Sequence, residues 1–186
     1  MSPKSRFERL VLPHLDAAYN LARWLARNPQ DAEDVVQDAC VRALRYLDSL
    51  RNEDAKAWFL TIVRHAFYDW VARNRPLELV HDAGDAIDAA IDTAAVDPLQ
   101  NALRRGDARA LTEALAALPL QFREVIVLRE LEDLSYREIA SVVDIPIGTV
   151  MSRLARGRAM LRRVPGLQPV SGVAGERNVG VERRRS

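Results

Sequence analysis

The last third of the chain concentrates positive charge in one short segment. Residues 147–163 contain no acidic residue and five arginines: Arg153, Arg156, Arg158, Arg162 and Arg163. Guanidinium groups at this density suit the phosphate oxygens of nucleic acids, which they bind through charge-assisted hydrogen bonds. Uncharged residues stand before and between the arginines: Thr149, Met151, Ser152 and Ala155. At the start of a helix, such side chains can approach the edges of bases.

The residues just upstream predict the element that presents this segment. Ser135 and Glu138 have the spacing of a capping box, so a helix is expected to begin there. Pro146 ends that helix, because an interior proline removes a hydrogen bond and clashes with the preceding turn. A second helix is expected from about Ile147, packed through Val150, Leu154 and Leu161. Two helices joined so closely predict a helix-turn-helix, whose second helix enters the major groove of duplex DNA.

A plainer interpretation is that the arginines form the solvated face of an ordinary helical bundle. Basic helices are common, and the arginines alone do not decide between the two. The capping box, the short turn, Pro146 and the charge occur together, and this combination favours duplex DNA binding.

Three apolar patterns fill the first 75 residues, each with the spacing typical of an amphipathic helix. The first runs from Phe7 to about Arg27 and ends at Asn28-Pro29. The second runs from about Gln30 to Leu47, and the third from about Lys56 to Asn74. Three helices with short connections predict a compact bundle.

The second of these helices carries an acidic and polar outer face, formed by Asp31, Glu33, Asp34, Gln37 and Asp38. Acids do not seek DNA, so this face either meets a basic protein partner or is simply solvated. The third helix instead mixes aromatic residues with cations such as Arg64 and His65. Aromatic rings beside cations suit unstacked bases, at about 1–3 kcal/mol per stacked base. At helical spacing, however, most of these rings are expected to be core.

Between the two halves, composition changes abruptly. Residues 76–100 contain six acids, no lysine or arginine, and much alanine, which predicts a flexible linker. Helical patterns return near Leu99 and again near Pro119. Residues 165–186 have turn formers and no periodicity, and we expect a disordered tail. The fold class is therefore all-α, with helical domains at 1–75 and 106–164, an acidic linker at 76–105 and a tail at 165–186.

Several functional classes lack their signatures. Cys40 is the only cysteine, and the three histidines are far apart in sequence, so neither a disulfide nor a metal site is expected. There is no glycine-rich phosphate loop and no nucleophile elbow, so we expect neither an enzyme nor a cofactor. The N-terminus does not read as a signal peptide, and no apolar run reaches the roughly 18 residues of a membrane span. We therefore expect a cytoplasmic protein without membrane insertion.

Two segments resemble one known family. Residues 31–73, DAEDVVQDACVRALRYLDSLRNEDAKAWFLTIVRHAFYDWVAR, are similar to region 2 of the bacterial extracytoplasmic-function (group IV) sigma factors of the sigma-70 family. Residues 117–161, ALPLQFREVIVLRELEDLSYREIASVVDIPIGTVMSRLARGRAML, are similar to region 4. Both motifs occur in the expected order and separation, which makes the resemblance far more specific than a lone helix-turn-helix.

This resemblance implies a promoter-specificity subunit of RNA polymerase that assists strand opening. The acidic face would dock on the clamp helices of the polymerase's largest subunit, with the flap as a further contact. The −10 promoter element, opened to single strands, would meet Leu50, Arg51, Asn52, Trp58, Arg64 and His65. The −35 duplex would meet Thr149, Met151, Ser152, Arg153, Ala155, Arg156 and Arg158. Many family members are held inactive by an anti-sigma protein, which makes such a protein a candidate partner.

Two positions depart from the family pattern. His65 stands where many members have Asn, which bears on the flipped base that is preferred. Met151 stands where many have a basic residue, so an apolar contact replaces a charged one. The linker allows simultaneous binding of both elements. Elements about 15–20 base pairs apart are separated by roughly 50–70 Å, and about 25 extended residues reach at most some 80 Å.

One alternative function remains open at this point. An autonomous regulator would use the N-terminal bundle to sense a ligand or to dimerise, and the helix-turn-helix to bind an operator without polymerase. It should bind duplex DNA tightly on its own. No apolar stripe is left over for a dimer seam, which disfavours this alternative.

Overall fold

The structure is a computed structural model that describes residues 3–51, 55–75 and 108–164 of the chain. The predicted linker at 76–105, the predicted tail at 165–186 and Asn52 lie outside the described residues. The described residues contain helices and no strand, which confirms the all-α fold class. No described helix is long and apolar enough to cross a membrane.

The first predicted helix is in fact interrupted. The structure has α1 (Pro3–Leu10), a short 3₁₀ turn η1 (Leu12–His14) and α2 (Leu15–Ala26). The prediction of one helix from Phe7 to Arg27 was therefore wrong, because Pro13 lacks the N–H that a continuous helix needs. Its apolar residues still face inward: Phe7, Val11, Ala18, Leu21 and Leu25 are all buried.

The next two helices confirm the predicted bundle. The Asn28 side chain accepts hydrogen bonds from the backbone N–H groups of Gln30 and Asp31, which starts α3 (Pro29–Arg45). A second 3₁₀ turn, η2 (Leu47–Ser49), leads toward α4 (Ala55–Asn74). Helices α2, α3 and α4 pack against one another around a core that includes Phe59, Leu60 and Val63.

The C-terminal bundle is built from α7 (Ala108–Ala117), α8 (Leu120–Ile126), the π-helical turn η4 (Val127–Leu131), α9 (Tyr136–Val143) and α10 (Ile147–Arg162). Gly157 lets α10 approach α8 closely. A Cβ atom at Gly157 would lie 3.0 Å from Ile126 Cγ1, inside normal packing distance. The contact between α8 and α10 therefore depends on the absence of a side chain in glycine at position 157.

The helix-turn-helix forms as predicted. The Ser135 hydroxyl accepts from the Glu138 N–H at 3.3 Å, and the Ser135 N–H donates to the Glu138 carboxylate at 2.7 Å, which confirms the capping box. Asp144 ends α9 in the left-handed conformation (φ 57°), which aspartate adopts more readily than most residues. Pro146 precedes the first residue of α10.

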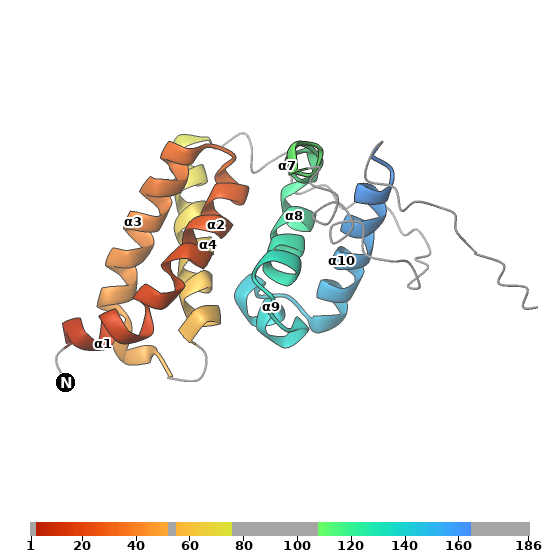
Figure 1. The fold of residues 1–186 in the computed structure, drawn as a ribbon. Coiled ribbons are helices and arrows are strands. Elements are labelled where there is room, and N and C mark those ends of the chain that lie inside the picture. The colour runs from red at the N-terminus through yellow and green to blue at the C-terminus, as the bar shows by residue number, and fades with distance from the viewer. Residues whose placement is uncertain (1–2, 52–54, 76–107, 165–186) are drawn as a thin grey trace, which may run out of the picture.

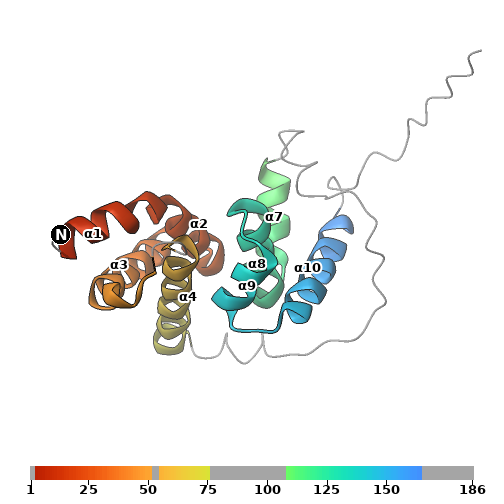
Figure 2. The ribbon, with the colours of Figure 1, turned by 90° about the horizontal axis from the view of Figure 1, so that it is seen from below.

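The two bundles lie side by side and touch (Figures 1 and 2). Helix α2 packs against α8 and η4, and α4 packs against α9. The helix-turn-helix thus lies against the N-terminal bundle, an arrangement that no sequence pattern predicted.

The capping box should make stability depend on pH. The hydrogen bonds from Ser135 lower the pKa of Glu138 below its ordinary value. Because the folded-state pKa is the lower one, the cap adds stability above the unfolded glutamate pKa of about 4.3, and this contribution is lost as pH falls through the folded pKa. We expect Glu138→Gln to be less stable than the unmodified chain at pH 7, with the difference vanishing in acid.

Urea unfolding at pH 7 and at about pH 3, followed by circular dichroism, measures this difference. The control is Glu113→Gln on α7, an exposed acid outside the cap. A Glu138→Gln deficit that is the same at both pH values would contradict the role of the ionised cap.

Candidate nucleic-acid and protein interfaces

The first turns of α10 present the uncharged residues predicted to approach bases. Met151 has 53% of its surface exposed, while Thr149, Ser152 and Ala155 are half-buried. The Ser152 hydroxyl donates to the Thr149 carbonyl at 3.0 Å, which orients it along the helix. The apolar side of α10, formed by Val150, Leu154 and Leu161, is buried as predicted. Met151 is therefore the most accessible of the four side chains.

Two arginines of α10 are bound to acids of the same bundle. Arg158 Nε donates to Glu130 at 3.1 Å, and a second guanidinium nitrogen bonds the same oxygen. Arg153 Nη1 lies 3.6 Å from a Glu124 carboxylate oxygen. Arg156 is half-buried. The sequence pattern did not indicate these ion pairs, because Glu124 lies on α8 and Glu130 on η4, both before α9 in the chain.

Glu124 is the most deeply buried charged residue in the described part of the chain, since only 1% of its surface is exposed. It accepts from Arg64 Nε at 3.0 Å and from the Tyr68 hydroxyl at 3.2 Å, both on α4 of the other bundle. Burial acts to lower the pKa of Arg64, but the charge and hydrogen bond of Glu124, together with Tyr68, outweigh it and raise that pKa. A buried carboxylate thus joins Arg64 to Arg153.

The residues predicted to meet the −10 element differ in how exposed they are to solvent. Leu50 is only 3% exposed, so its side chain is not available to DNA in this structure and instead packs in the bundle core. Arg51 is exposed, and Asn52 lies outside the described residues. Trp58 is half-buried, and its indole N–H donates to the Ser49 hydroxyl at 3.2 Å. Arg64 and His65 are neighbours on α4, but only His65 is exposed.

An open cleft of about 610 Å³ lies beside His65. Its walls are formed by Arg42, Tyr46, Ile62, Arg64, His65, Tyr68 and Asp69. Tyr46, with 61% of its surface exposed, and Tyr68 were missing from the residues selected by sequence. The feature of the sequence that could have identified Tyr46 was its position directly after the last residue of α3. The cleft combines rings and cations, as a site for an unstacked base requires.

The acidic face of α3 divides into two groups. Asp31 pairs with Arg75 at 2.9 Å and Asp38 lies 3.9 Å from Arg73, so these two carboxylates link α3 to the end of α4. Asp38 also pairs with Arg42 within α3 at 2.8 Å. Glu33, Asp34 and Gln37 are exposed and have no ion pair within the described residues. The second group is therefore the part of the face that is open to a partner.

The open part of this face continues into apolar residues. Val41 and Leu44 are 47% and 49% exposed, and they follow Asp34 and Gln37 at spacings that keep all four on one side of α3. Sequence reasoning missed Val41 and Leu44 because it followed charge alone. The helical spacing of these two residues from Asp34 and Gln37 could have identified them from the sequence.

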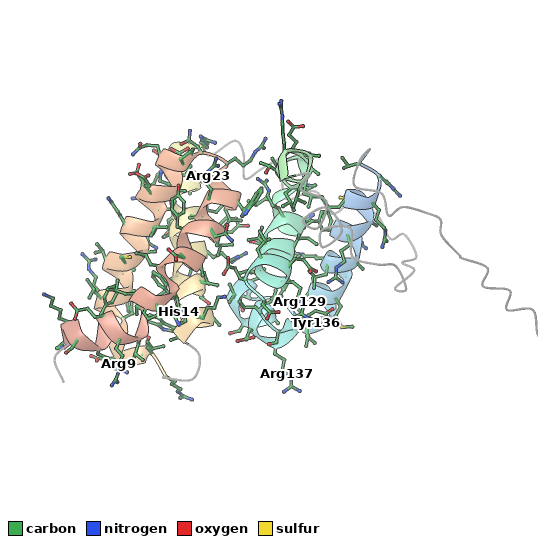
Figure 3. The ribbon with its side chains drawn as sticks, in the orientation of Figure 1. Arg9, His14, Arg23, Arg129, Tyr136 and Arg137 are labelled. Carbon is green, nitrogen blue, oxygen red and sulfur yellow. The ribbon has the colours of Figure 1, made fainter. Side chains whose placement is uncertain are left out.

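Arg129 lies against the aromatic ring of Tyr136 beside the helix-turn-helix. Arg129 stacks over the Tyr136 ring at 5.3 Å and donates to the Leu134 carbonyl at 2.8 Å, so it braces the turn that leads into α9 (Figure 3).

The described residues contain no group of three or more acids, histidines or cysteines able to hold a metal.

The pairing of Arg153 predicts a structural role beside any contact with DNA. Arg153→Ala should lower the free energy of unfolding by about 1–3 kcal/mol, because it leaves the buried Glu124 carboxylate with one partner fewer. The control Arg163→Ala removes an exposed charge one residue beyond α10 and should cost less than about 0.5 kcal/mol. Urea unfolding of both variants measures the difference, and equal stabilities would contradict the structural role.

Comparisons with known proteins match both halves of the chain. The Sigma-70 region 2 family profile matches residues 10–76, and the Sigma-70, region 4 profile matches residues 108–161. The ECF RNA polymerase sigma factor SigE of Mycolicibacterium smegmatis is 34% identical over 84% of this chain and 60% of its own length. The chain therefore spans less than two thirds of that relative.

A second relative is matched over nearly its full length. The RNA polymerase sigma-H factor of Pseudomonas aeruginosa is 34% identical over 90% of this chain and 89% of its own. Among solved structures, the sigma factor RpoE of Bartonella quintana, crystallised with the anti-sigma factor NepR, superposes with a TM-score of 0.65. It is 28% identical and covers 85% of this chain and 95% of that one. Two sigma regions in order, on the helical bundles described above, show that this chain belongs to the extracytoplasmic-function sigma factors, which direct RNA polymerase to promoters.

Proposed function

We propose that this sigma factor divides its work among three surfaces. Helix α3 docks on core RNA polymerase, the cleft beside α4 captures the opened −10 element, and α10 binds the −35 duplex. The observation that carries the proposal is the separation of an acidic and apolar face on α3 from the cations of α4 and α10. The polymerase would supply the chemistry, and the autonomous regulator is not favoured because both sigma regions are present.

The docking surface consists of Glu33, Asp34, Gln37, Val41 and Leu44. Its acidic end would repel DNA and suit a basic protein, while Val41 and Leu44 supply apolar area for a stable contact. The clamp helices of the polymerase's largest subunit are the partner that the family resemblance implies. Contact of the C-terminal bundle with the flap remains a prediction.

For the −10 element, we propose that an unstacked base enters the cleft beside His65. Tyr46 and Tyr68 offer rings for stacking, and the backbone phosphates would compete for Arg42 with Asp38 and Asp69, and for Arg64 with Glu124. Capture of bases in this way would favour the open strands at about 1–3 kcal/mol per stacked base. Arg51 and Trp58 lie on the preceding loop and the first turn of α4, where they line a separate cavity with Thr61, Arg137 and Ser141.

For the −35 element, α10 would enter the major groove with Met151 toward the bases. Ala155 lies one helical turn beyond Met151, Thr149 and Ser152 stand in the same first turns, and the arginines farther along the helix would meet the phosphates. Met151 offers an apolar contact that suits a thymine methyl group.

The direct test of this function is run-off transcription with purified bacterial core polymerase on sheared genomic DNA of the source organism. Discrete transcripts that require this chain support the proposal, and their aligned upstream sequences give both promoter elements. Absence of such transcripts, combined with tight duplex binding by the chain alone, would contradict it and favour the autonomous regulator.

Docking predicts a specific loss of assembly. We expect Asp34→Lys combined with Gln37→Lys to weaken binding to core polymerase by about tenfold or more, because like charges then face a basic partner. Circular dichroism should be unchanged, since both side chains are exposed. Co-purification with tagged core polymerase measures assembly. Asp16→Lys, an exposed change of the same sign on α2, is the control, and full assembly of the double variant would place docking elsewhere.

Binding of the −35 duplex predicts a salt-dependent contribution from α10. Arg156→Ala should weaken binding of the chain to its promoter duplex and reduce the salt slope by about one, as expected for one lost phosphate contact. The control Arg109→Ala removes the same charge from α7, where the side chain is exposed. Fluorescence anisotropy across a salt series measures both slopes, and identical slopes would remove Arg156 from the DNA contact.

A further inference from the structure

The segment between α3 and α4 lies beside two cavities at once. Tyr46, at its start, lines the cleft of about 610 Å³ that is proposed to hold an unstacked base. Ser49 and Arg51, toward its end, line a second cavity of about 460 Å³ together with Trp58 of α4. We call residues 46–51 the connecting segment. Its position decides where Tyr46 and Arg51 can meet a DNA strand.

Arg6 of α1 holds the end of the connecting segment. Its Nη2 donates to the Leu50 carbonyl at 2.8 Å, and its Nη1 lies 3.5 Å from the Asp48 carboxylate. Asp48 is fully exposed, so solvent weakens that ion pair, and the bond to the Leu50 carbonyl is the stronger contact. The Leu50 side chain is buried, and its N–H donates to the Leu47 carbonyl at 3.2 Å. Leu50 is therefore fixed by its side chain, its N–H and its carbonyl.

The bond from Arg6 also acts on the residue that follows Leu50. A carbonyl and the next N–H belong to one planar peptide unit, so a bond that holds the Leu50 carbonyl also orients the backbone at Arg51. Arg51 is exposed and has no ion pair among the described residues, so its charge is open to a phosphate. Arg6 itself is not among the described residues that line either cavity. Any effect of Arg6 on a strand in these cavities therefore passes through the connecting segment.

A second contact reaches the connecting segment from α4. The Trp58 indole N–H donates to the Ser49 hydroxyl at 3.2 Å, and that hydroxyl donates to the Tyr46 carbonyl at 2.7 Å. The Ser49 hydroxyl thus accepts from a ring that lines one cavity and donates to the backbone of a residue that lines the other. Both cavities therefore share one short segment, which Arg6 holds from one helix and Trp58 from another.

A segment that already has its bound conformation binds a ligand more tightly than a mobile one. Ordering of free backbone and side chains during binding costs conformational entropy, and this cost is subtracted from the affinity. The bonds of Arg6 and Ser49 impose that order during folding. Loss of either bond should weaken capture of the −10 strand. Docking on polymerase should be unchanged, because the docking surface on α3 includes neither residue.

We propose that Arg6 is a positioning residue for the −10 element: from α1 it holds the connecting segment so that Tyr46 and Arg51 stand ready for the opened strand. This inference rests on the proposed function, since it concerns capture of the −10 element. It adds a role for α1, a helix that none of the three proposed surfaces includes. The Sigma-70 region 2 profile begins at residue 10, so the family match does not assign this role to Arg6.

The first measurement reads the connecting segment itself. A nitroxide label at Arg51→Cys, introduced after Cys40→Ser removes the only native cysteine, reports local mobility by continuous-wave electron paramagnetic resonance. Arg6→Ala should shorten the rotational correlation time of this label, because the Leu50 carbonyl loses its donor. Arg9→Ala removes the same charge from an exposed residue of α1 (Figure 3) and should leave the correlation time unchanged.

The second measurement reads strand capture in the holoenzyme. The templates are the promoters identified by run-off transcription, and the quantity is the equilibrium constant for heparin-resistant open complexes. Arg6→Ala should lower this constant about fivefold, the order of effect expected when one more group must be ordered on binding. Arg9→Ala should match the unmodified chain. Co-purification with tagged core polymerase should be equal for all three chains.

Ser49→Ala is a second variant that changes no charge. It removes the hydroxyl between Trp58 and Tyr46 and should lower the open-complex constant in the same direction as Arg6→Ala. Ser49 is exposed, so the fold should tolerate this change. Circular dichroism checks that each variant folds, and Ser49→Ala carries the test if Arg6→Ala does not fold.

The outcomes separate this inference from the proposed function. A more mobile label and fewer open complexes in Arg6→Ala, with Arg9→Ala unchanged, would support it. A label as restrained as in the unmodified chain, or open complexes equal to those of Arg9→Ala, would overturn the positioning role while run-off transcription by the unmodified chain still stands. A chain that yields no transcript with core polymerase would overturn the proposed function and the −10 role of Arg6 together, and label mobility would then test only the bond to Leu50.

Discussion

The buried carboxylate of Glu124 is the constraint on which the rest of this structure depends. A charge with 1% of its surface exposed must be paired, and its partners come from both halves of the chain. Arg153 binds it from within the C-terminal bundle, and Arg64 and Tyr68 bind it from α4. The ion pairs and hydrogen bonds of Glu124 thus stabilise the helix-turn-helix and also help to hold the two bundles against each other.

This arrangement gives the DNA-binding cations two uses. In the free chain Arg153 and Arg158 neutralise acids of their own bundle, and Arg64 neutralises an acid of the other. On a promoter, phosphates would compete for the same guanidinium groups. Helix α3 stands apart from this competition, because Glu33 and Asp34 have no ion pair among the described residues. The open part of α3 is therefore accessible to a partner while these arginines are paired.

The sequence predicted the elements well where the signal was local. Asn28-Pro29, the Ser135–Glu138 capping box and Pro146 each mark a boundary through bonds to their own backbone neighbours. Prediction failed at Pro13, where a continuous apolar stripe hid the break between α1 and α2. It could not find the contact between the two bundles, because Arg64 lies 60 residues from Glu124 and Asn20 lies 112 residues from Glu132. Nor could it show that Leu50 is buried, since a loop residue carries no periodicity.

The most direct test of this account is the distance between α4 and α10 with and without the Glu124 carboxylate. Spin labels at Ala72→Cys and Met160→Cys, both exposed positions, would be introduced after Cys40→Ser removes the only native cysteine. Double electron–electron resonance should give one short, narrow distribution in the labelled chain and a broader one after Glu124→Gln removes the shared charge. A long or broad distribution in the labelled chain, or no change in the Glu124→Gln variant, would contradict the role of Glu124 in holding the two bundles together.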